Sequence, residues 1–168
     1  FVATGDFTLG KELEIFEKKF AKLIGTKYAV GVNSGTDAIK LSLKAVGIKS
    51  GDEVITAANT FVATVGAITE IGAIPKFVDC DDTFCMNVEN LEKKITKKTK
   101  AIVPVHFTGY MTNMIELNKI AKKYKIPIVE DACQSILASI NNKNSGTWSD
   151  FGAFSLHPLK NINVWSDG

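Results

Sequence analysis

The sequence predicts an α/β protein with a three-layer α/β/α arrangement, in which helices cover both faces of a mostly parallel sheet. Short apolar runs alternate with stretches of helical periodicity along most of the chain. This alternation favours parallel strands joined by helical crossovers. Hydrophobic residues make up 45% and charged residues 23% of the 168 residues, which is ordinary for a globular domain with a sizeable core. We therefore expect one domain over the whole chain.

The expected elements follow one another in a regular order. A first helix covers residues 9–24, because apolar residues recur on one face from Leu9 to Leu23 and Gly25 ends the pattern. Strands are expected at 28–32, 53–57, 75–79, 101–107, 126–132 and 151–156, helices at 36–46, 60–71, 88–96 and 113–124, and a polar turn at 141–149. Asn87 is the expected N-cap of the helix that follows it.

The composition argues against several classes of function. Net charge is +2, from 20 basic and 18 acidic residues, which gives no electrostatic case for nucleic acid or a membrane surface as partner. No apolar run reaches the roughly 18 residues of a membrane span, and nothing at the start resembles a signal peptide. Cys80, Cys85 and Cys133 form no CxxC pair and leave one over. We expect no metal site and no disulfide framework in a reduced, cytoplasmic protein.

Two further features concern what the chain lacks. Every basic residue is a lysine, so no guanidinium of this segment can hold a carboxylate or phosphate in a bidentate manner. Backbone N–H groups, hydroxyl groups or lysine would have to bind a phosphate. The chain also starts without methionine and stops at "WSDG" with no terminating element. We therefore expect it to be a piece of a longer protein.

The motif "NSGTDA" (33–38) lies where the first expected strand meets a helix. Gly35 would let the backbone turn tightly, and the helix N-terminus offers free N–H groups to an anion. Ser34 and Thr36 add hydroxyl groups. A plain helix cap is the alternative, because Ser, Thr and Asp favour that position in any helix. The motif alone leaves both interpretations open.

The motif "VEDACQS" (129–135) ends a β-branched strand with two acids. Strand periodicity sends Glu130 and Asp131 to opposite faces. A carboxylate at the end of a central strand is costly unless it has a cationic or hydrogen-bonding partner. It can be a turn or capping aspartate, or a charge that keeps a ligand cation protonated.

Two more motifs follow the ends of expected strands, "ANTFVAT" (58–64) and "FSLHPLKN" (154–161). Phe61 could offer a flat face to a ring, although a single aromatic is more often part of the core. Lys160 could be an ordinary surface charge. It follows an apolar strand, however, and a lysine in a desolvated pocket is a competent amine nucleophile. Ser155 precedes it and could supply a second phosphate hydroxyl.

The carboxyl ends of the strands in a parallel sheet meet at one edge, and ligands bind there. The four motifs would then gather a phosphate cradle, a stacking ring, a carboxylate and a nucleophilic amine. Pyridoxal 5′-phosphate requires all four: a Schiff-base lysine for its aldehyde, a carboxylate for its pyridinium nitrogen, and donors for its phosphate.

These motifs, in this order, also carry a resemblance to a known family. The stretches "LGKELEIFEKKFAKLIGTKYAVGVNSGTDAI", "GDEVITAANTFVAT", "GAIPKFVD", "KTKAIVPVHFTG", "VEDACQS" and "FSLHPLKN" cover essentially the whole chain. The sequence resembles the sugar aminotransferases of the DegT/DnrJ/EryC1/StrS group, which are fold-type-I pyridoxal-phosphate enzymes. The resemblance implies that residues 1–168 are the cofactor-binding large domain, incomplete on its C-terminal side, with the small C-terminal domain absent from this sequence.

The resemblance also implies roles for individual residues. Lys160 resembles the lysine that forms the Schiff base with the cofactor and then shuttles protons. Asp131 resembles the partner of the pyridinium nitrogen. Gln134 resembles the glutamine beside the cofactor ring, and Phe61 resembles the aromatic residue that stacks on it. His106 is expected to be structural or to lie in the outer shell of the site.

Further residues are matched to the cofactor phosphate and to the pocket. Gly35, Thr36 and Ser155 resemble phosphate contacts, and Ser34 is a weaker candidate for the same role. His157 lies at a position that varies in the family and is expected to form a wall of the pocket, with proton transfer as an alternative.

The implied reaction moves an amino group, from glutamate, to a keto group of a nucleotide-linked sugar in surface-glycan or deoxyaminosugar synthesis. The implied assembly is a homodimer with a shared active site. Two alternatives remain. A dehydratase of the same fold carries histidine in place of the lysine, against which Lys160 argues. A non-catalytic regulator that binds the cofactor would not need a nucleophilic amine.

Overall fold

The centre of the structure is a parallel sheet. The computed structural model describes residue 5 and residues 8–165. The strands of the sheet are β1 (Glu53–Ala57), β2 (Ile74–Val78), β3 (Thr99–Val103), β4 (Val129–Asp131) and β7 (Phe151–Ala153). β1 lies between β2 and β3, β4 pairs with β7, and all of these pairings are parallel. Parallel bridges, one of them from Val105 to Asp131, join the two groups in the order β2-β1-β3-β4-β7.

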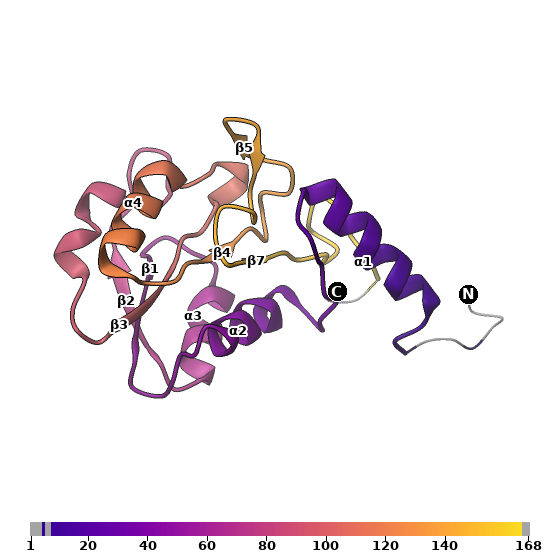
Figure 1. Cartoon of the computed structure of the whole chain (residues 1–168), viewed down its shortest axis with the longest axis horizontal. Helices are drawn as coiled ribbons and strands as arrows, with labels where there is room; N and C mark the ends of the chain where they lie inside the picture. Colours follow the sequence, from indigo (N-terminus) through magenta and orange to yellow (C-terminus); the bar gives the residue numbers. More distant parts are fainter. Residues whose placement is uncertain (1–4, 6–7, 166–168) are drawn as a thin grey trace.

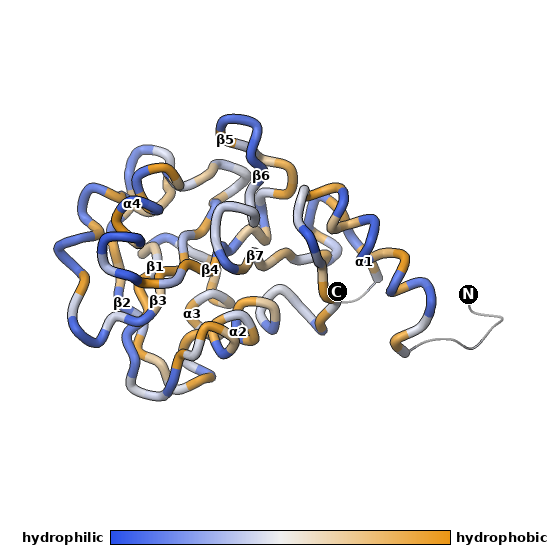
Figure 2. The backbone as a smooth tube through the Cα atoms, in the orientation of Figure 1, coloured by the Kyte–Doolittle hydropathy of each residue, from blue (hydrophilic) through white to orange (hydrophobic). Residues whose placement is uncertain are grey.

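Helices cover both faces of the sheet (Figure 1). α2 (Gly35–Ala45) and α3 (Val62–Glu70) lie on one face, and α4 (Met114–Tyr124) lies on the other. Successive strand residues point to opposite faces. Val54 accordingly packs in the apolar cluster with α2 and α3, whereas Ile55 packs in the cluster with α4. Figure 2 shows that hydrophobic residues occur along the strands and along the helices that face them. The three-layer α/β/α arrangement predicted from the sequence is confirmed.

The first helix, α1 (Lys11–Ile24), lies beyond β7 and projects from the sheet (Figure 1). It ends at Gly25, whose left-handed backbone (φ 89°) closes the last turn. Its C-terminal part packs on the domain, where the ring of Phe20 meets that of Phe154 edge-on at 5.2 Å. The buried residues include Ile24 and not the expected Leu23, which is exposed. In the described part of the chain, no helix is long and apolar enough to cross a membrane.

The strand expected at residues 28–32 does not form. Tyr28 and Val30 are 70% and 77% exposed, and the Gly31 N–H group donates to the Glu17 carboxylate at 2.7 Å. The prediction is wrong because a strand exists only where another strand completes its hydrogen bonds, and no described segment pairs with this one. Local β-propensity cannot supply that partner.

The helix expected at residues 88–96 forms in a different shape. Two short 3₁₀ turns, η2 (Val88–Asn90) and η3 (Glu92–Lys94), replace one α-helix. Asn87 caps the first of them as expected, because its side chain accepts a hydrogen bond from the Glu89 N–H group. A further 3₁₀ turn, η4 (Phe107–Gly109), follows β3.

The polar stretch after β4 forms a small hairpin. β5 (Ser139–Ile140) and β6 (Lys143–Asn144) pair in antiparallel fashion. Asn141 and Asn142 connect them with φ of 51° and 60°, a left-handed conformation that asparagine tolerates better than most residues. The hairpin leads the chain back to β7. The turn predicted at 141–149 is found, except that residues 143–144 form β6.

Candidate active site

The motifs found in the sequence come together at the carboxyl edge of the sheet. Residues 58–64 follow β1, Asp131 ends β4, and residues 154–161 follow β7. The N-terminus of α2 at Gly35 lies at the same edge, in contact with Ser155. Ligands of open parallel sheets bind at this edge, because the strand ends and helix N-termini leave polar backbone groups there.

Asp131 is held at the end of β4 by two hydrogen bonds within the described chain. Its Oδ2 atom accepts from the Thr64 hydroxyl at 2.7 Å, and its Oδ1 atom accepts from the Cys133 backbone N–H at 3.2 Å. The residue is only 5% exposed. A carboxylate has about four acceptor positions, so this one can still accept a bond from a ligand.

Lys160 and Phe61 lie against one another although a hundred residues separate them. The backbone N–H group of Lys160 closes a turn by donating to the His157 carbonyl at 2.8 Å. The side-chain Nζ atom of Lys160 lies 5.8 Å from the centre of the Phe61 ring. Phe61 is 60% exposed, so it is not the core residue that a lone aromatic usually is. Lys160 is half-buried, and the desolvated environment expected from the sequence is not observed here.

A hollow of about 440 Å³ opens beside Lys160. Thr108, Gln134, Leu159 and Asn161 line it together with the lysine. The Gln134 side chain is fixed, because its Oε1 atom accepts from the Thr108 backbone N–H at 2.8 Å. The sequence-predicted residues Lys160 and Gln134 therefore share one cavity.

Gly35 is the point at which α2 approaches the strand ends. It is the first helical residue and does not have a positive φ, so the tight turn expected from the sequence is not its function. A Cβ atom at this position would lie 2.8 Å from both Cys133 Sγ and Ser155 Cβ. Glycine is needed because any side chain would push the helix N-terminus away from these neighbours.

Ser34 and Thr36 flank Gly35 at the start of α2. Ser34 is the N-cap, and its Oγ atom accepts from the Asp37 N–H group at 3.1 Å. The capping interpretation is therefore correct for Ser34, although its hydroxyl hydrogen can still be donated. A hydrogen bond from Lys40 lowers the pKa of Asp37 below its ordinary value. Thr36 is half-buried in the first turn.

Cys133 lies between the carboxylate and the helix N-terminus. Burial, followed by the charge of Asp131, raises the pKa of its thiol well above the usual value, while the charge of Lys160 acts in the opposite direction. The thiol is therefore protonated at neutral pH.

Sequence reasoning missed three residues of this edge: Thr60, Thr64 and Thr108. The hydroxyl groups of Thr60 and Thr64 lie 2.7 Å apart, and Thr64 contacts Asp131. Their spacing of four residues at a helix start was a usable signal, because such residues lie on the same face of a helix. Nothing in the sequence indicated that the Thr108 backbone would bind Gln134.

Glu130 points to the other face of β4, away from this edge. Its carboxylate accepts from His106 Nε2 (2.9 Å), Gly146 N (2.8 Å), Trp148 N (2.7 Å) and Ser149 Oγ (2.7 Å). Glu130 and His106 are both fully buried. The Thr112 N–H group donates to His106 Nδ1, so the ring carries its proton on Nε2. This network ties β4 to the segment before β7, and His106 is structural as expected.

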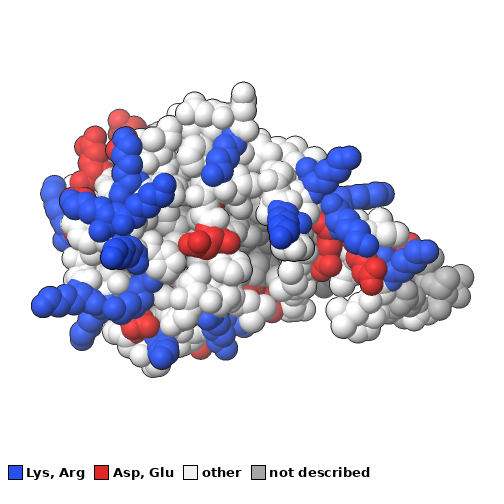
Figure 3. Space-filling model, in the orientation of Figure 1, with Lys and Arg blue, Asp and Glu red and all other residues white. Residues whose placement is uncertain are grey.

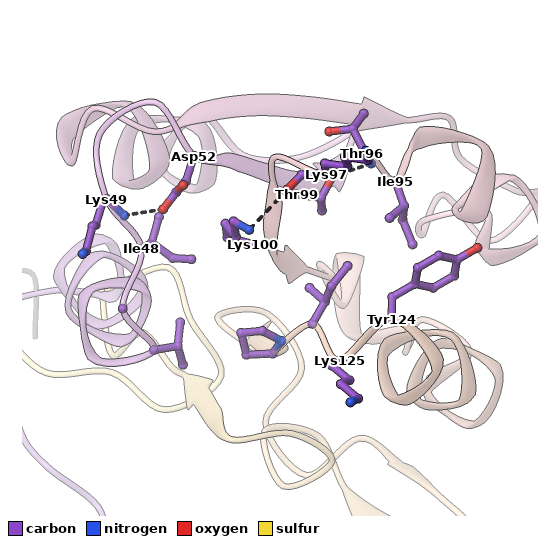
Figure 4. A pocket seen from close by; sticks show the side chains of 14 residues that line it. Ile48, Lys49, Asp52, Ile95, Thr96, Lys97, Thr99, Lys100, Tyr124 and Lys125 are labelled. Carbon is purple, nitrogen blue, oxygen red and sulfur yellow. Dashed lines mark hydrogen bonds between the residues drawn. The ribbon is translucent and has the colours of Figure 1, made fainter.

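A larger hollow, of about 900 Å³, lies at the opposite, amino edge of the sheet (Figure 4). Its lining comes from the segments that precede β1, β3 and β4 and from the first two residues of β3, Thr99 and Lys100. Lys49, Lys97, Lys100 and Lys125 are exposed residues there, and lysines gather over α4 on the same side of the molecule (Figure 3). We assign the site to the smaller hollow, because the buried carboxylate and the helix N-terminus lie on its side of the sheet.

The fold and the site together define a class of protein. It is a parallel α/β domain that gathers an amine, an aromatic ring, a carboxylate and a helix N-terminus at the carboxyl edge of its sheet. The chain belongs to the DegT/DnrJ/EryC1/StrS aminotransferase family, whose model matches residues 1–168.

Known relatives agree with this assignment. A dTDP-3-amino-3,4,6-trideoxy-alpha-D-glucose transaminase of Micromonospora megalomicea subsp. nigra is 42% identical over 167 residues, which cover 99% of this chain and 45% of that protein. The crystal structure of NtdA from Bacillus subtilis with bound cofactor PMP superimposes with a TM-score of 0.93 and 40% identity, covering 98% of this chain and 37% of that one.

A third relative has a different activity. A GDP-4-keto-6-deoxymannose-3-dehydratase, solved with a trapped PLP-glutamate geminal diamine, superimposes with a TM-score of 0.92 and 36% identity, covering 98% of this chain and 45% of that one. The chain thus spans less than half the length of each of these proteins. Its fold matches the corresponding part of pyridoxal-phosphate aminotransferases.

Proposed function

We propose that the complete protein is a pyridoxal-phosphate-dependent aminotransferase that transfers an amino group, from glutamate, to a keto group of a nucleotide-linked sugar. The observation that carries this proposal is the convergence of the Lys160 amine, the Phe61 ring and the Asp131 carboxylate at one edge of the sheet. Membership of the family and the activity of the transaminase relative support it. Because the chain spans less than half of its relatives, the activity is proposed for the complete protein.

The residues present fit the cofactor. Its phosphate would meet the N-terminus of α2, where the absence of a side chain at Gly35 brings the helix against Ser155. The hydroxyl groups of Ser34, Thr36 and Ser155 add donors, which matter because the chain contains no arginine. Asp131 has acceptor capacity left for a ring N–H group.

When bound, the cofactor supplies an electron sink for the bond that breaks at the amino-bearing carbon. The Lys160 amine would hold the cofactor aldehyde carbon covalently and, once released, carry a proton on Nζ to and from the substrate carbon. The Asp131 carboxylate would hold the proton on the ring nitrogen. Phe61 would cover one face of the ring and exclude water there, and Gln134 would border the ring from the Lys160 hollow.

The same-fold dehydratase is the main alternative, since one such enzyme is 36% identical to this chain. The resemblance places a histidine at the lysine position in that class. This chain has Lys160 there, with its Nζ atom near the Phe61 ring. A regulator without catalysis has no use for that amine, so Lys160 favours the aminotransferase over both alternatives.

We further infer that residues 1–168 are part of the cofactor-binding large domain of a cytoplasmic homodimer that builds its active site from both subunits. Tyr28, Val30 and Trp165 are 70%, 77% and 100% exposed. Large apolar side chains that remain exposed are typical of surfaces that another domain or subunit covers.

The test uses the complete protein. Purified enzyme should absorb visible light through its bound cofactor, and borohydride reduction followed by peptide mass spectrometry should place the cofactor on Lys160. Incubation with glutamate and a panel of nucleotide ketosugars should release 2-oxoglutarate and an amino sugar in equal amounts. A protein that binds no pyridoxal phosphate, or that eliminates water from the sugar without transferring nitrogen, would contradict the proposal.

A further inference from the structure

We propose that Thr64 is a positioning residue, which fixes the Phe61 ring and the Asp131 carboxylate relative to one another. The inference rests on the proposed function, since both groups would hold the same cofactor ring. Thr64 is fully buried in the first turn of α3 and is not one of the residues that line the Lys160 hollow. It would act through its two neighbours and not on the reacting atoms.

The side chain of Thr64 connects α3 to the end of β4. Its hydroxyl group donates to Asp131 Oδ2 at 2.7 Å, across 67 positions of sequence. A carboxylate oxygen can only accept, so the single hydroxyl hydrogen of Thr64 is committed to Asp131. A hydrogen bond to a charged acceptor is short and directional, so it fixes the plane of the carboxylate.

The backbone of Thr64 connects the same residue to the aromatic ring. Its N–H group donates to the Phe61 carbonyl at 3.1 Å and closes the turn in which Phe61 is the N-cap of α3. One residue therefore bonds to the turn that presents the ring and to the carboxylate. The ring would stack on the cofactor, and the carboxylate would meet the edge of the cofactor.

Thr60 extends this arrangement by one step. Its hydroxyl lies 2.7 Å from that of Thr64. The Thr64 hydrogen is directed to Asp131, so Thr60 is the donor in this pair, whose 2.7 Å separation is shorter than the 3.4 Å from the Thr60 hydroxyl to its other acceptor, the Phe61 carbonyl. A chain of hydrogen bonds in a buried site polarises its members and strengthens the last one, so Thr60 supports the bond from Thr64 to Asp131.

The experiment compares variants of the complete enzyme that differ in one hydroxyl group. Thr64→Val keeps the branched shape and loses the hydroxyl, whereas Thr64→Ser keeps the hydroxyl. Thr69→Val is the matched control, because Thr69 lies on the same helix, is exposed and bonds only locally to the Gly66 carbonyl. Thr60→Val tests the supporting step. The readouts are kcat and KM, the ¹⁵N chemical shift of ring-labelled cofactor, and the unfolding midpoint of the cofactor-free protein.

Thr64→Val should lower kcat about tenfold with KM changed less than about twofold, because the lost bond serves the reacting complex and not substrate binding. Its ring-nitrogen signal should move toward that of unprotonated pyridine. In Thr64→Ser, kcat and the ring-nitrogen signal should both be close to those of the wild type. Thr60→Val should change both in the same direction as Thr64→Val but by less, and Thr69→Val should match the wild type. In the cofactor-free protein, the amide signal of Cys133, which also bonds to Asp131, should shift in Thr64→Val but not in Thr64→Ser.

Three outcomes would overturn the inference. A Thr64→Val enzyme with normal kcat and a normal ring-nitrogen signal would do so, and so would equal losses in Thr64→Ser and Thr64→Val. In both cases a wild-type enzyme that binds pyridoxal phosphate and transfers nitrogen leaves the proposed function intact. A wild-type protein that binds no cofactor would overturn the function and the positioning inference together.

Discussion

Two neighbouring carboxylates on one strand have opposite surroundings. Glu130 is fully buried and accepts hydrogen bonds from four groups of the described chain, which occupy both of its oxygen atoms. Asp131 is almost as buried, and its carboxylate accepts from the Thr64 hydroxyl and from the Cys133 backbone N–H group. The strand alternation separates them by directing one to each face of the sheet.

The difference shows how one strand can serve structure and chemistry at once. A carboxylate whose acceptor positions are all used has nothing left to offer a ligand, so Glu130 can only hold parts of the fold together. Asp131 is oriented by its two partners and keeps acceptor capacity, at the edge of the sheet that also carries Lys160 and Phe61. We therefore propose that the face of β4 that carries Asp131 is the functional face, and that the Glu130 face is structural.

The largest effect should come from Lys160→Ala on the functional face. Without this amine the cofactor has no covalent attachment and no proton carrier, so transamination and visible absorbance should both be lost while the unfolding midpoint of the cofactor-free enzyme stays near that of the wild type. Lys143→Ala is the matched control, because the Lys143 amine also lies over an aromatic ring, that of Trp148, at 4.8 Å but outside the site. A borohydride-trapped adduct in the Lys160→Ala enzyme would show that another lysine holds the cofactor.

The next largest effect should distinguish the role of Asp131 from that of Glu130. Asp131→Asn should retain cofactor binding but lose activity, because the ring nitrogen would no longer be paired with a negative charge. The loss of an ion pair in a buried site costs several kcal/mol, and each ~1.4 kcal/mol is about a tenfold change in rate, so kcat should fall by about 100-fold or more. Steady-state kinetics with glutamate measure this, and an enzyme of near-normal rate would remove Asp131 from the mechanism.

Glu130→Gln should act on stability instead of rate. The amide nitrogen of glutamine is a donor and would face groups that are themselves donors, so at least one of the four hydrogen bonds becomes a repulsive contact. We expect the free energy of unfolding of the complete enzyme to fall by about 3 kcal/mol. Urea denaturation measures it, with the exposed Glu116→Gln as control. If the variant instead lost kcat and kept its stability, Glu130 would belong to the functional face.

The sequence was sufficient to predict the layers of the fold because they depend on local periodicity. Apolar runs such as that of β1 and the helical face of α4 are each written in a few neighbouring residues. The strand expected at 28–32 failed because pairing depends on a partner far along the chain. The helix expected after Asn87 became two 3₁₀ turns, although its cap was correctly identified.

The candidate site was predictable to a similar degree. Asp131, which ends β4, and Lys160, in the segment that follows β7, could be predicted to share one edge because the carboxyl ends of parallel strands meet there. The need for glycine at position 35 could not be predicted in this way. It depends on the close approach of Ser155, which lies 120 positions further along the chain. The partners of Asp131 were missed for the same reason, since the bond from Thr64 is made only by folding.

Gly35→Ala tests the close approach on the functional face. The added Cβ atom would lie 2.8 Å from Cys133 Sγ and Ser155 Cβ, closer than carbon atoms approach without repulsion, so the start of α2 must move. Overpacking of this kind costs typically about 1–3 kcal/mol, and we expect about tenfold weaker cofactor binding in equilibrium dialysis. Gly66→Ala in α3 is the control, because a Cβ atom there meets nothing within 4 Å. Equal cofactor affinity in the two variants would show that the approach of α2 is not needed.

The smallest effect should appear in the reactivity of the Cys133 thiol, whose pKa depends on the charges of Asp131 and Lys160. Burial and the charge of Asp131 raise the pKa of Cys133, so Asp131→Asn should lower it and increase the rate of alkylation by iodoacetamide in the cofactor-free enzyme. Lys160→Met should have the opposite effect, since the lysine charge lowers the same pKa. The rates are measured across pH by mass spectrometry of the peptide that contains Cys133, with Cys80 as the internal control.

The sign of the linked change in stability follows from the same pKa. Because the folded value lies above the unfolded value of about 8.5, the associated stability is fully present below that pH and is lost as pH rises toward the folded pKa. Cys133→Ala should therefore flatten the decline of the unfolding midpoint above about pH 9. If Asp131→Asn and Lys160→Met changed the Cys133 alkylation rate in the same direction, their charges would not act on this thiol. The Asp131 carboxylate and the Lys160 amine would then not face one site.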